Sequence, residues 1–137
     1  MAILTEQEAK NLIDKILSYS KADEISVTLN GGRTGNIRYA RNTVSTNGET
    51  DNLAYSITSV FGKRAGTATG NEFDDATLEK TVRRSEEVAR LAPENPEYMP
   101  VLGPQQFQKG LNFSEASARI GPLFRVDAAL ASIQACI

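Results

Sequence analysis

The spacing of apolar residues changes several times along the chain, and each change predicts a different element. Between residues 5 and 19 the apolar side chains Leu12, Ile13 and Ile16 form one stripe with helical spacing. Thr5 followed three residues later by Glu8 is a capping-box pattern and predicts the helix start. We therefore expect a helix over 5–19 whose apolar stripe covers a sheet. A partner-binding helix is the alternative.

From residue 25 the period becomes two. Ile25, Val27 and Leu29 alternate with polar residues, which predicts a strand buried on one face. The glycine- and asparagine-rich run 30–36 predicts a turn, because both residue types tolerate positive φ. This run also resembles a phosphate-cradling loop, but no helix start follows it and it lacks a Gly-Lys-Ser/Thr motif. We interpret it as a hairpin turn between two strands.

Further extended stretches follow, and short turns at 47–48 and 62–64 separate them. Strands joined by short turns pair antiparallel, so we expect a mainly antiparallel sheet of four or five strands. Gly66 and Gly70 predict a bent last strand or the close approach of another backbone. The expected stretches are 37–40, 43–46, 53–61 and 65–70.

A second helical pattern covers residues 74–92. Asp74 or Asp75 can cap its first turn, and Pro93 ends it. Its charged residues are expected to face water: Glu79, Lys80, Arg83, Arg84, Glu86 and Glu87. The whole pattern predicts an α+β fold, in which the N-terminal helix and this helix pack on the sheet. The predicted core consists of Leu12, Ile16, Ile25, Val27, Leu29, Ile37, Tyr55, Ile57, Val60, Leu78, Val82 and Ala89.

Composition changes after the second helix and predicts three parts. Residues 1–92 form the α+β domain, and residues 93–113 are a proline-rich linker that crosses the surface in extended form. Residues 114–137 begin a further helical segment, with apolar residues at helical spacing after Pro122. Because this segment stops on an apolar helix without a polar or glycine end, we expect it to be the truncated start of a longer one.

The chain contains no histidine, and its only cysteine is Cys136. A site of imidazole and thiolate zinc ligands is therefore excluded, and so is a catalytic triad with a histidine base. The 15 Lys and Arg residues against 17 Asp and Glu give a formal charge of −2, which argues against a nucleic-acid partner. There is no signal-peptide pattern and no apolar run of about 20 residues, so we expect no membrane contact. A single cysteine fits a reducing, cytoplasmic location.

Other groups of charged residues do not form credible sites. The carboxylates of Asp74-Asp75 and Glu86-Glu87 are adjacent in sequence, so their side chains point apart and do not make an acid/base couple. Arg83-Arg84 is interpreted as a solubility feature. The segment Arg38–Arg41, with Tyr39, could contact a ligand, but cross-strand packing explains it more simply. We therefore predict no catalytic, cofactor-binding or metal-binding residue in this chain.

The succession of elements nevertheless resembles a known family. The stretches that carry the resemblance are 22–27, 55–68, 71–78 and 88–96. Together they resemble the N-terminal domain of the TldD/PmbA family, once called modulators of DNA gyrase. The resemblance covers about residues 5–100 and lies in the order of patterns, because no single motif is diagnostic. One departure is the run 51–54, Asp-Asn-Leu-Ala, where the family commonly has a glycine-containing lead into the long strand.

The resemblance implies a part of a zinc metallopeptidase that degrades or processes peptides. In such proteins a histidine-containing helical motif in the C-terminal half carries the metal and the glutamate base. No catalytic residue transfers to this chain, because it has no histidine. The resemblance implies that this domain contributes to the subunit interface and to the wall of the peptide cavity, in a homodimer or a heterodimer with a paralogous subunit.

The full-length parent is then either a zinc peptidase or a metal-free partner subunit of one. The alternative is a stand-alone protein-interaction module with no catalytic half. A metal-free enzyme that uses its own carboxylates is a distant third, because no carboxylate pair has a suitable spacing.

Overall fold

The computed structural model describes residues 4–108, 110 and 113–136. They form two compact units. The first unit combines Met1–Gly32 with Asn52–Gln105, and the second combines Arg33–Asp51 with Gln106–Ile137. The units thus interleave along the chain. The sequential division into a domain, a linker and a truncated helical segment stays a prediction.

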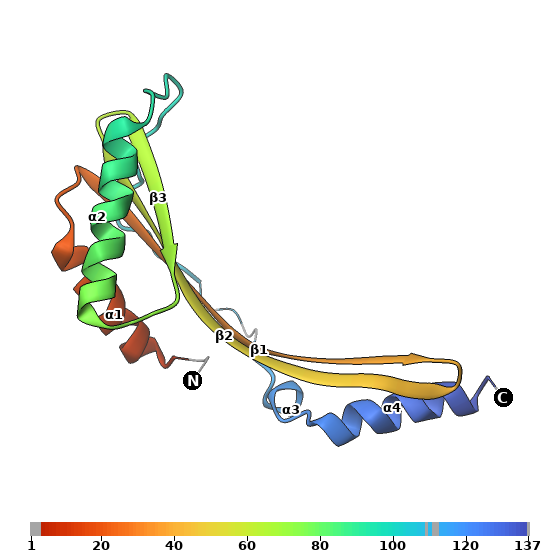
Figure 1. Ribbon diagram of the computed structural model, residues 1–137. Coiled ribbons are helices and arrows are strands. Elements are labelled where there is room, and N and C mark those ends of the chain that lie inside the picture. Colours follow the sequence, from red (N-terminus) through yellow and green to blue (C-terminus); the bar gives the residue numbers. More distant parts are fainter. Residues whose placement is uncertain (1–3, 109, 111–112, 137) are drawn as a thin grey trace. The chain divides into compact units, whose positions relative to one another are not determined.

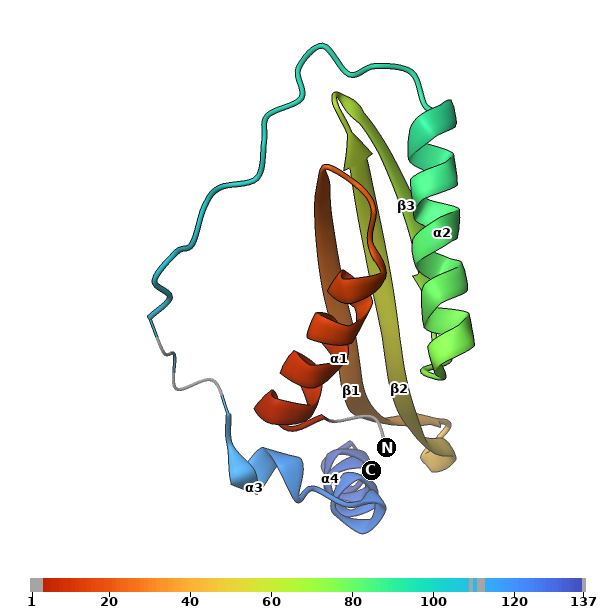
Figure 2. The same ribbon diagram turned by 90° about the vertical axis from the view of Figure 1, so that its left-hand side faces the viewer.

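The first unit contains a sheet covered by two helices on one face. Its elements follow in the order α1 (Glu6–Tyr19), β1 (Glu24–Ala40), β2 (Thr43–Phe61), β3 (Arg64–Gly70) and α2 (Asp75–Leu91), of which β1 and β2 continue into the second unit. The strand order is β1-β2-β3. Figures 1 and 2 show α1 over β1 and α2 over β3, both on the same face of the sheet. The α+β class and the antiparallel arrangement are confirmed.

The sheet has three strands, so the expected number of four or five is wrong. The predicted turns at 30–36 and 47–48 lie inside the long strands β1 and β2. The hairpin instead turns at Arg41 and Asn42, which have positive φ values of 52° and 60°. Two consecutive left-handed residues make the tight turn that matches strand twist, and asparagine tolerates this conformation. The positions of the glycines in the sequence therefore did not locate the turn between β1 and β2.

Both helices of the first unit begin where the sequence predicts. The Thr5 side chain accepts a hydrogen bond from the Glu8 backbone, and the Glu8 carboxylate accepts one from the Thr5 N–H at 2.8 Å. The Asp74 carboxylate accepts one from the Thr77 N–H at 3.0 Å. Each cap satisfies backbone donors that have no partner within the helix. Hydrogen bonds from Thr77, first from its side chain and then from its backbone N–H, lower the pKa of Asp74.

The core of the first unit lies between the helices and the sheet. Its central cluster consists of the buried residues Ile16, Tyr55, Ile57, Leu78 and Val82. Around them pack the partly buried residues Leu12, Tyr19, Ile25, Val27, Leu29 and Phe73. The predicted core residues Val60 and Ala89 are also buried. The sequence therefore predicted most of this core. Ile37 is the exception, because it lies in the second unit.

Helix α2 approaches β3 at the level of the backbone. In the antiparallel pairing of β2 with β3, Ser59 lies opposite Gly66. A Cβ atom at Gly66 would lie 2.1 Å from the Ala89 nitrogen and 2.5 Å from the Ser85 carbonyl oxygen. Only glycine fits there, and this confirms the predicted close approach of another backbone.

In the second unit a helix packs against the end of the β1–β2 hairpin. This helix is α4 (Pro122–Gln134), which buries Ala129 and Ile133 and follows the short helix α3 (Glu115–Ala118), in which no residue is buried. Arg125 joins α4 to β2, because its guanidinium donates to Asn47 Oδ1 at 3.2 Å and to Glu49 Oε1 at 2.9 Å. Hydrogen bonds from Arg33 and then Arg125 lower the pKa of Glu49. Among the described residues, no helix is long and apolar enough to cross a membrane.

Candidate functional site

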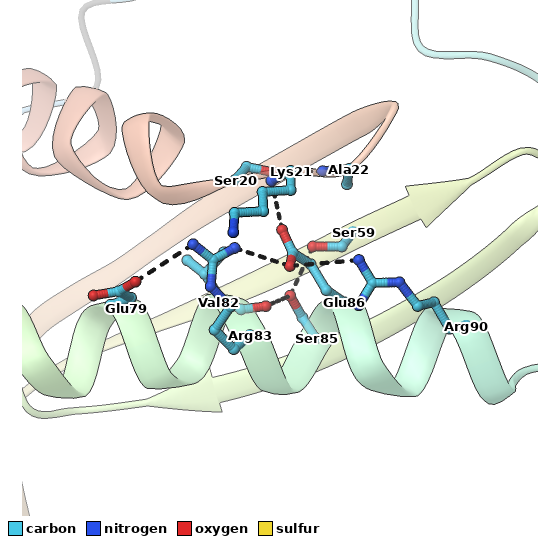
Figure 3. Close-up of polar contacts among 10 residues, drawn as sticks. All are labelled: Ser20, Lys21, Ala22, Ser59, Glu79, Val82, Arg83, Ser85, Glu86 and Arg90. Carbon is cyan, nitrogen blue, oxygen red and sulfur yellow. Dashed lines mark hydrogen bonds and ion pairs between the residues drawn. The ribbon is translucent and has the colours of Figure 1, made fainter.

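A buried carboxylate lies at the centre of the polar contacts in the first unit (Figure 3). The Glu86 side chain is only 1% exposed. Its carboxylate accepts a hydrogen bond from the Lys21 backbone N–H at 2.5 Å and one from the Arg83 guanidinium at 3.0 Å. The Arg90 guanidinium lies 3.9 Å away. The prediction that Glu86 faces water is therefore wrong.

The sequence contained a signal for this burial. Glu86 lies four residues after Val82 and three before Ala89, so it falls inside the apolar stripe of α2. Arg83 is likewise more than a solubility feature, because it pairs with both Glu86 and Glu79. The hydrogen bond to Glu86 is the largest cause of the raised pKa of Arg83.

Glu86, Arg83, Arg90 and the Lys21 backbone N–H form a group that we call the Glu86 cluster, and it is suited to holding elements together. Both carboxylate oxygens accept from donors of the chain itself, and these donors join the segment after α1 to helix α2. Beside it, the buried hydroxyls of Ser59 and Ser85 lie 2.7 Å apart and join β2 to α2. A fully satisfied buried network fixes one arrangement of its elements.

An apolar groove of about 330 Å³ lies in the second unit, between the hairpin and α4. Its apolar lining comes from Ile37, Tyr39, Ile120, Phe124, Ala128 and Ala129. Arg125 also lines the groove, and its guanidinium is already bound to Glu49. Tyr39 is 48% exposed. The groove is suited to accept an apolar side chain. The residues that line it do not pair an acid with a base for catalysis.

The remaining acidic residues singled out in the sequence serve local structure. Asp74 caps α2, and Asp75 pairs with Lys15 of α1 at 2.5 Å. Within the described part of the chain, no group of three potential ligands among His, Cys, Asp and Glu comes together. Cys136 is exposed. The separated carboxylates and the single cysteine do not fit a zinc ion, which prefers four tetrahedral ligands rich in nitrogen and sulfur.

Comparison with known proteins adds to these observations. Residues 26–89 match the family described as PmbA/TldA metallopeptidase domain 1. The fold is similar to the crystal structure of TldE from Thermococcus kodakarensis, with a TM-score of 0.75 at 14% sequence identity. That similarity covers 93% of this chain and 28% of the TldE chain. The comparison with curated proteins found no match.

Proposed function

Since residues 26–89 form a first domain of the PmbA/TldD family, we propose that this chain is the non-catalytic N-terminal portion of a TldD/PmbA-type peptidase assembly. In this role it forms part of a subunit interface and of the wall of a cavity in which peptides are processed. Proteolysis is carried out by another part of the parent protein or by a paralogous subunit.

The match of residues 26–89 to a metallopeptidase first domain is the observation that carries this proposal. The matched segment contains most of β1, the strands β2 and β3, and most of α2 with Arg83 and Glu86. Its buried polar side chains Ser59, Ser85 and Glu86 are hydrogen-bonded within the chain, as expected for a wall rather than a reaction centre.

The chemistry of the side chains supports the division of roles. Zinc peptidases need neutral imidazole or carboxylate ligands around the metal and a general base beside it. This chain has no histidine, and the described residues hold no ligand cluster. Zinc is therefore assigned to another part of the assembly, and no step of hydrolysis is assigned to these residues.

The test is a peptidase assay with zinc and an unstructured peptide substrate. The chain is assayed alone, and then together with the metal-bearing paralogue from the same genome. We expect no hydrolysis by the chain alone and faster, chelator-sensitive hydrolysis when both are present than with the paralogue alone. Hydrolysis by the chain alone would overturn the proposal. An unchanged rate of the paralogue would overturn the version of the proposal in which a paralogous subunit carries out proteolysis.

A further inference from the structure

The segment that follows α2 is tied to the sheet of the first unit at two points. At the first point, the Asn95 N–H donates to the Lys63 carbonyl oxygen, in the turn between β2 and β3, at 3.0 Å. At the second point, the Glu24 carboxylate at the start of β1 accepts hydrogen bonds from the segment. The Asp23 N–H, directly before β1, donates to the Val60 carbonyl oxygen near the end of β2. Both points therefore lie at the same end of the sheet, and the segment crosses this end toward the outer strand.

Two donors of the segment meet at one oxygen of Glu24. Tyr98 Oη donates to Glu24 Oε2 at 2.5 Å, and the Val101 N–H donates to the same oxygen at 3.1 Å. Hydrogen bonds to a charged acceptor are stronger than those between neutral groups. The bond to Glu24 is also the largest cause of the raised pKa of Tyr98, so the phenol stays protonated and remains a donor at neutral pH. One carboxylate therefore holds both a side chain and the backbone of the segment.

Burial of apolar surface contributes little to holding this segment in place. Met99 is 82% exposed and Leu102 is 81% exposed, and Val101 is exposed as well. Within the described ranges, the backbone-to-backbone hydrogen bond that residues 96–101 make is internal to the segment, from the Tyr98 N–H to the Asn95 carbonyl oxygen at 3.2 Å. Segments with few buried apolar contacts open locally at a low cost in free energy. The position of residues 96–101 therefore depends mainly on the bonds to Glu24.

The strand that Glu24 begins is an edge strand without the usual protecting residues. The strand order β1-β2-β3 places β1 at one side of the sheet. Lysines, prolines and other charged residues commonly prevent another chain from pairing with an edge, and a covering loop serves the same purpose. Residues 25–32 contain no lysine, arginine, carboxylate or proline. Residues 98–101 lie beside the first residue of this strand, where a covering loop would protect it.

We propose that residues 96–101 form a strap that opens and closes over the start of β1, with Asn95 as its fixed end and Glu24 as its latch. In the closed state Tyr98 and Val101 are bonded to Glu24, and the strap covers the first residues of the edge of β1 that faces away from β2. In the open state both bonds are broken, whereas the bond from Asn95 to Lys63 remains. This inference does not depend on the peptidase role proposed above, so failure of either proposal leaves the other standing.

Exchange of the Val101 amide with water tests the latch. Tyr98→Phe removes one of the two bonds to Glu24 and leaves β1 unchanged. We expect the Val101 amide to exchange about fivefold faster or more, measured by NMR magnetisation transfer from water. Glu24→Ala removes both bonds and should produce a larger increase. The matched control is Glu97→Ala, at an exposed neighbouring residue, which should not change the exchange of Val101.

A soluble paramagnetic agent tests whether the strap covers the edge, because it broadens the NMR signals of the amides that it can reach. In Tyr98→Phe, the broadening at Ile25 and Ser26 near the start of β1 should increase relative to the wild type. Thr69 of β3 is the internal control, since it is exposed on another strand and should be unaffected. Tyr98→Phe is preferred to Glu24→Ala for this measurement because the latter changes the edge itself.

Each part of the proposal can be overturned separately. An unchanged exchange rate of Val101 in Glu24→Ala would exclude the latch, and unchanged broadening at Ile25 in Tyr98→Phe would exclude the covered edge. Faster exchange of the Asn95 amide together with that of Val101 would exclude Asn95 as the fixed end. The amides of α2 report on folding of the first unit. If Glu24→Ala accelerates their exchange as well, Tyr98→Phe decides, and an unchanged Val101 rate there overturns the proposal.

Discussion

Gly66 of β3 lies directly against the backbone of Ala89 of α2, where a Cβ atom would be 2.1 Å from the Ala89 nitrogen. This contact lets the helix approach the sheet closely enough for Ser85 to reach Ser59 at 2.7 Å. The backbone contact and the buried hydroxyl pair are therefore consequences of the same missing side chain. Both belong to the segment that matches the metallopeptidase first domain.

The first prediction concerns Gly66→Ala. The added methyl group would overlap the backbone of Ser85 and Ala89, which cannot move as a flexible side chain does. We expect a loss of about 1–3 kcal/mol in the free energy of unfolding, measured by urea denaturation. The matched control is Gly32→Ala in β1, where no atom lies within 4 Å of the new Cβ. Equal effects at both positions would contradict the contact.

The second prediction concerns the buried pair Ser59 and Ser85. The Ser85 hydroxyl donates to the Val82 carbonyl at 2.8 Å, so the Ser59 hydroxyl is the donor in the pair. Ser85→Ala leaves that donor buried without an acceptor and should cost about 1–3 kcal/mol. Ser59→Ala removes the donor itself and should cost less, and the double variant should resemble Ser59→Ala. A double-mutant cycle with no coupling would contradict this order.

The third prediction concerns the buried carboxylate. Glu86→Ala removes the acceptor of the Lys21 N–H and should lower the free energy of unfolding by about 1–3 kcal/mol. The neighbouring Glu87 is exposed, so Glu87→Ala is the matched control and should change stability by less than about 0.5 kcal/mol. Thermal and urea unfolding of both variants measure the difference. A loss at Glu87 as large as that at Glu86 would argue against the cluster.

The fourth prediction is a pH dependence in the second unit. Arg33 and Arg125 lower the pKa of Glu49 below its ordinary value of 4.5. A carboxylate with a lowered pKa in the folded state stabilises it above the unfolded-state pKa, and the contribution is lost as the pH falls through the folded-state value. We therefore expect the contact of α4 with β2 to weaken in acid. Amide exchange of α4 measured against pH should show this loss.

The control for this dependence is Glu49→Gln. It removes the titrating group, so the acid-induced increase in α4 exchange should disappear while α1, in the first unit, behaves as before. An unchanged pH profile in Glu49→Gln would show that another group controls the contact.

Local sequence patterns predicted the amphipathic helices, because their caps and apolar stripes lie within the helix sequence itself. The capping box at Thr5, the Asp74 cap and the apolar stripes located both helices of the first unit and most of its core. Gly66 was recognised as a point of close approach, although its partner Ala89 was not. These features depend on neighbours in sequence, which is why the sequence could reveal them.

The strand boundaries and the buried charge depend on contacts that are distant in sequence. Glycine and asparagine at 30–36 remain extended because β1 pairs with β2, and the turn falls at Arg41 and Asn42 instead. The apolar stripe of α2 places Glu86 on the buried face, and its carboxylate is satisfied there by the Lys21 N–H, 65 residues away in the chain. No local pattern reports such a partner. The prediction that the chain contains no catalytic residue concerns chemistry and stays a prediction.

The most direct test of the central claim is the zinc content and peptidase activity of the purified chain alone. After incubation with zinc and removal of the excess by gel filtration, mass spectrometry gives the metal bound per chain, and an unstructured peptide reports hydrolysis. The non-catalytic role predicts no stoichiometric zinc and no hydrolysis. One zinc per chain together with chelator-sensitive hydrolysis would contradict it.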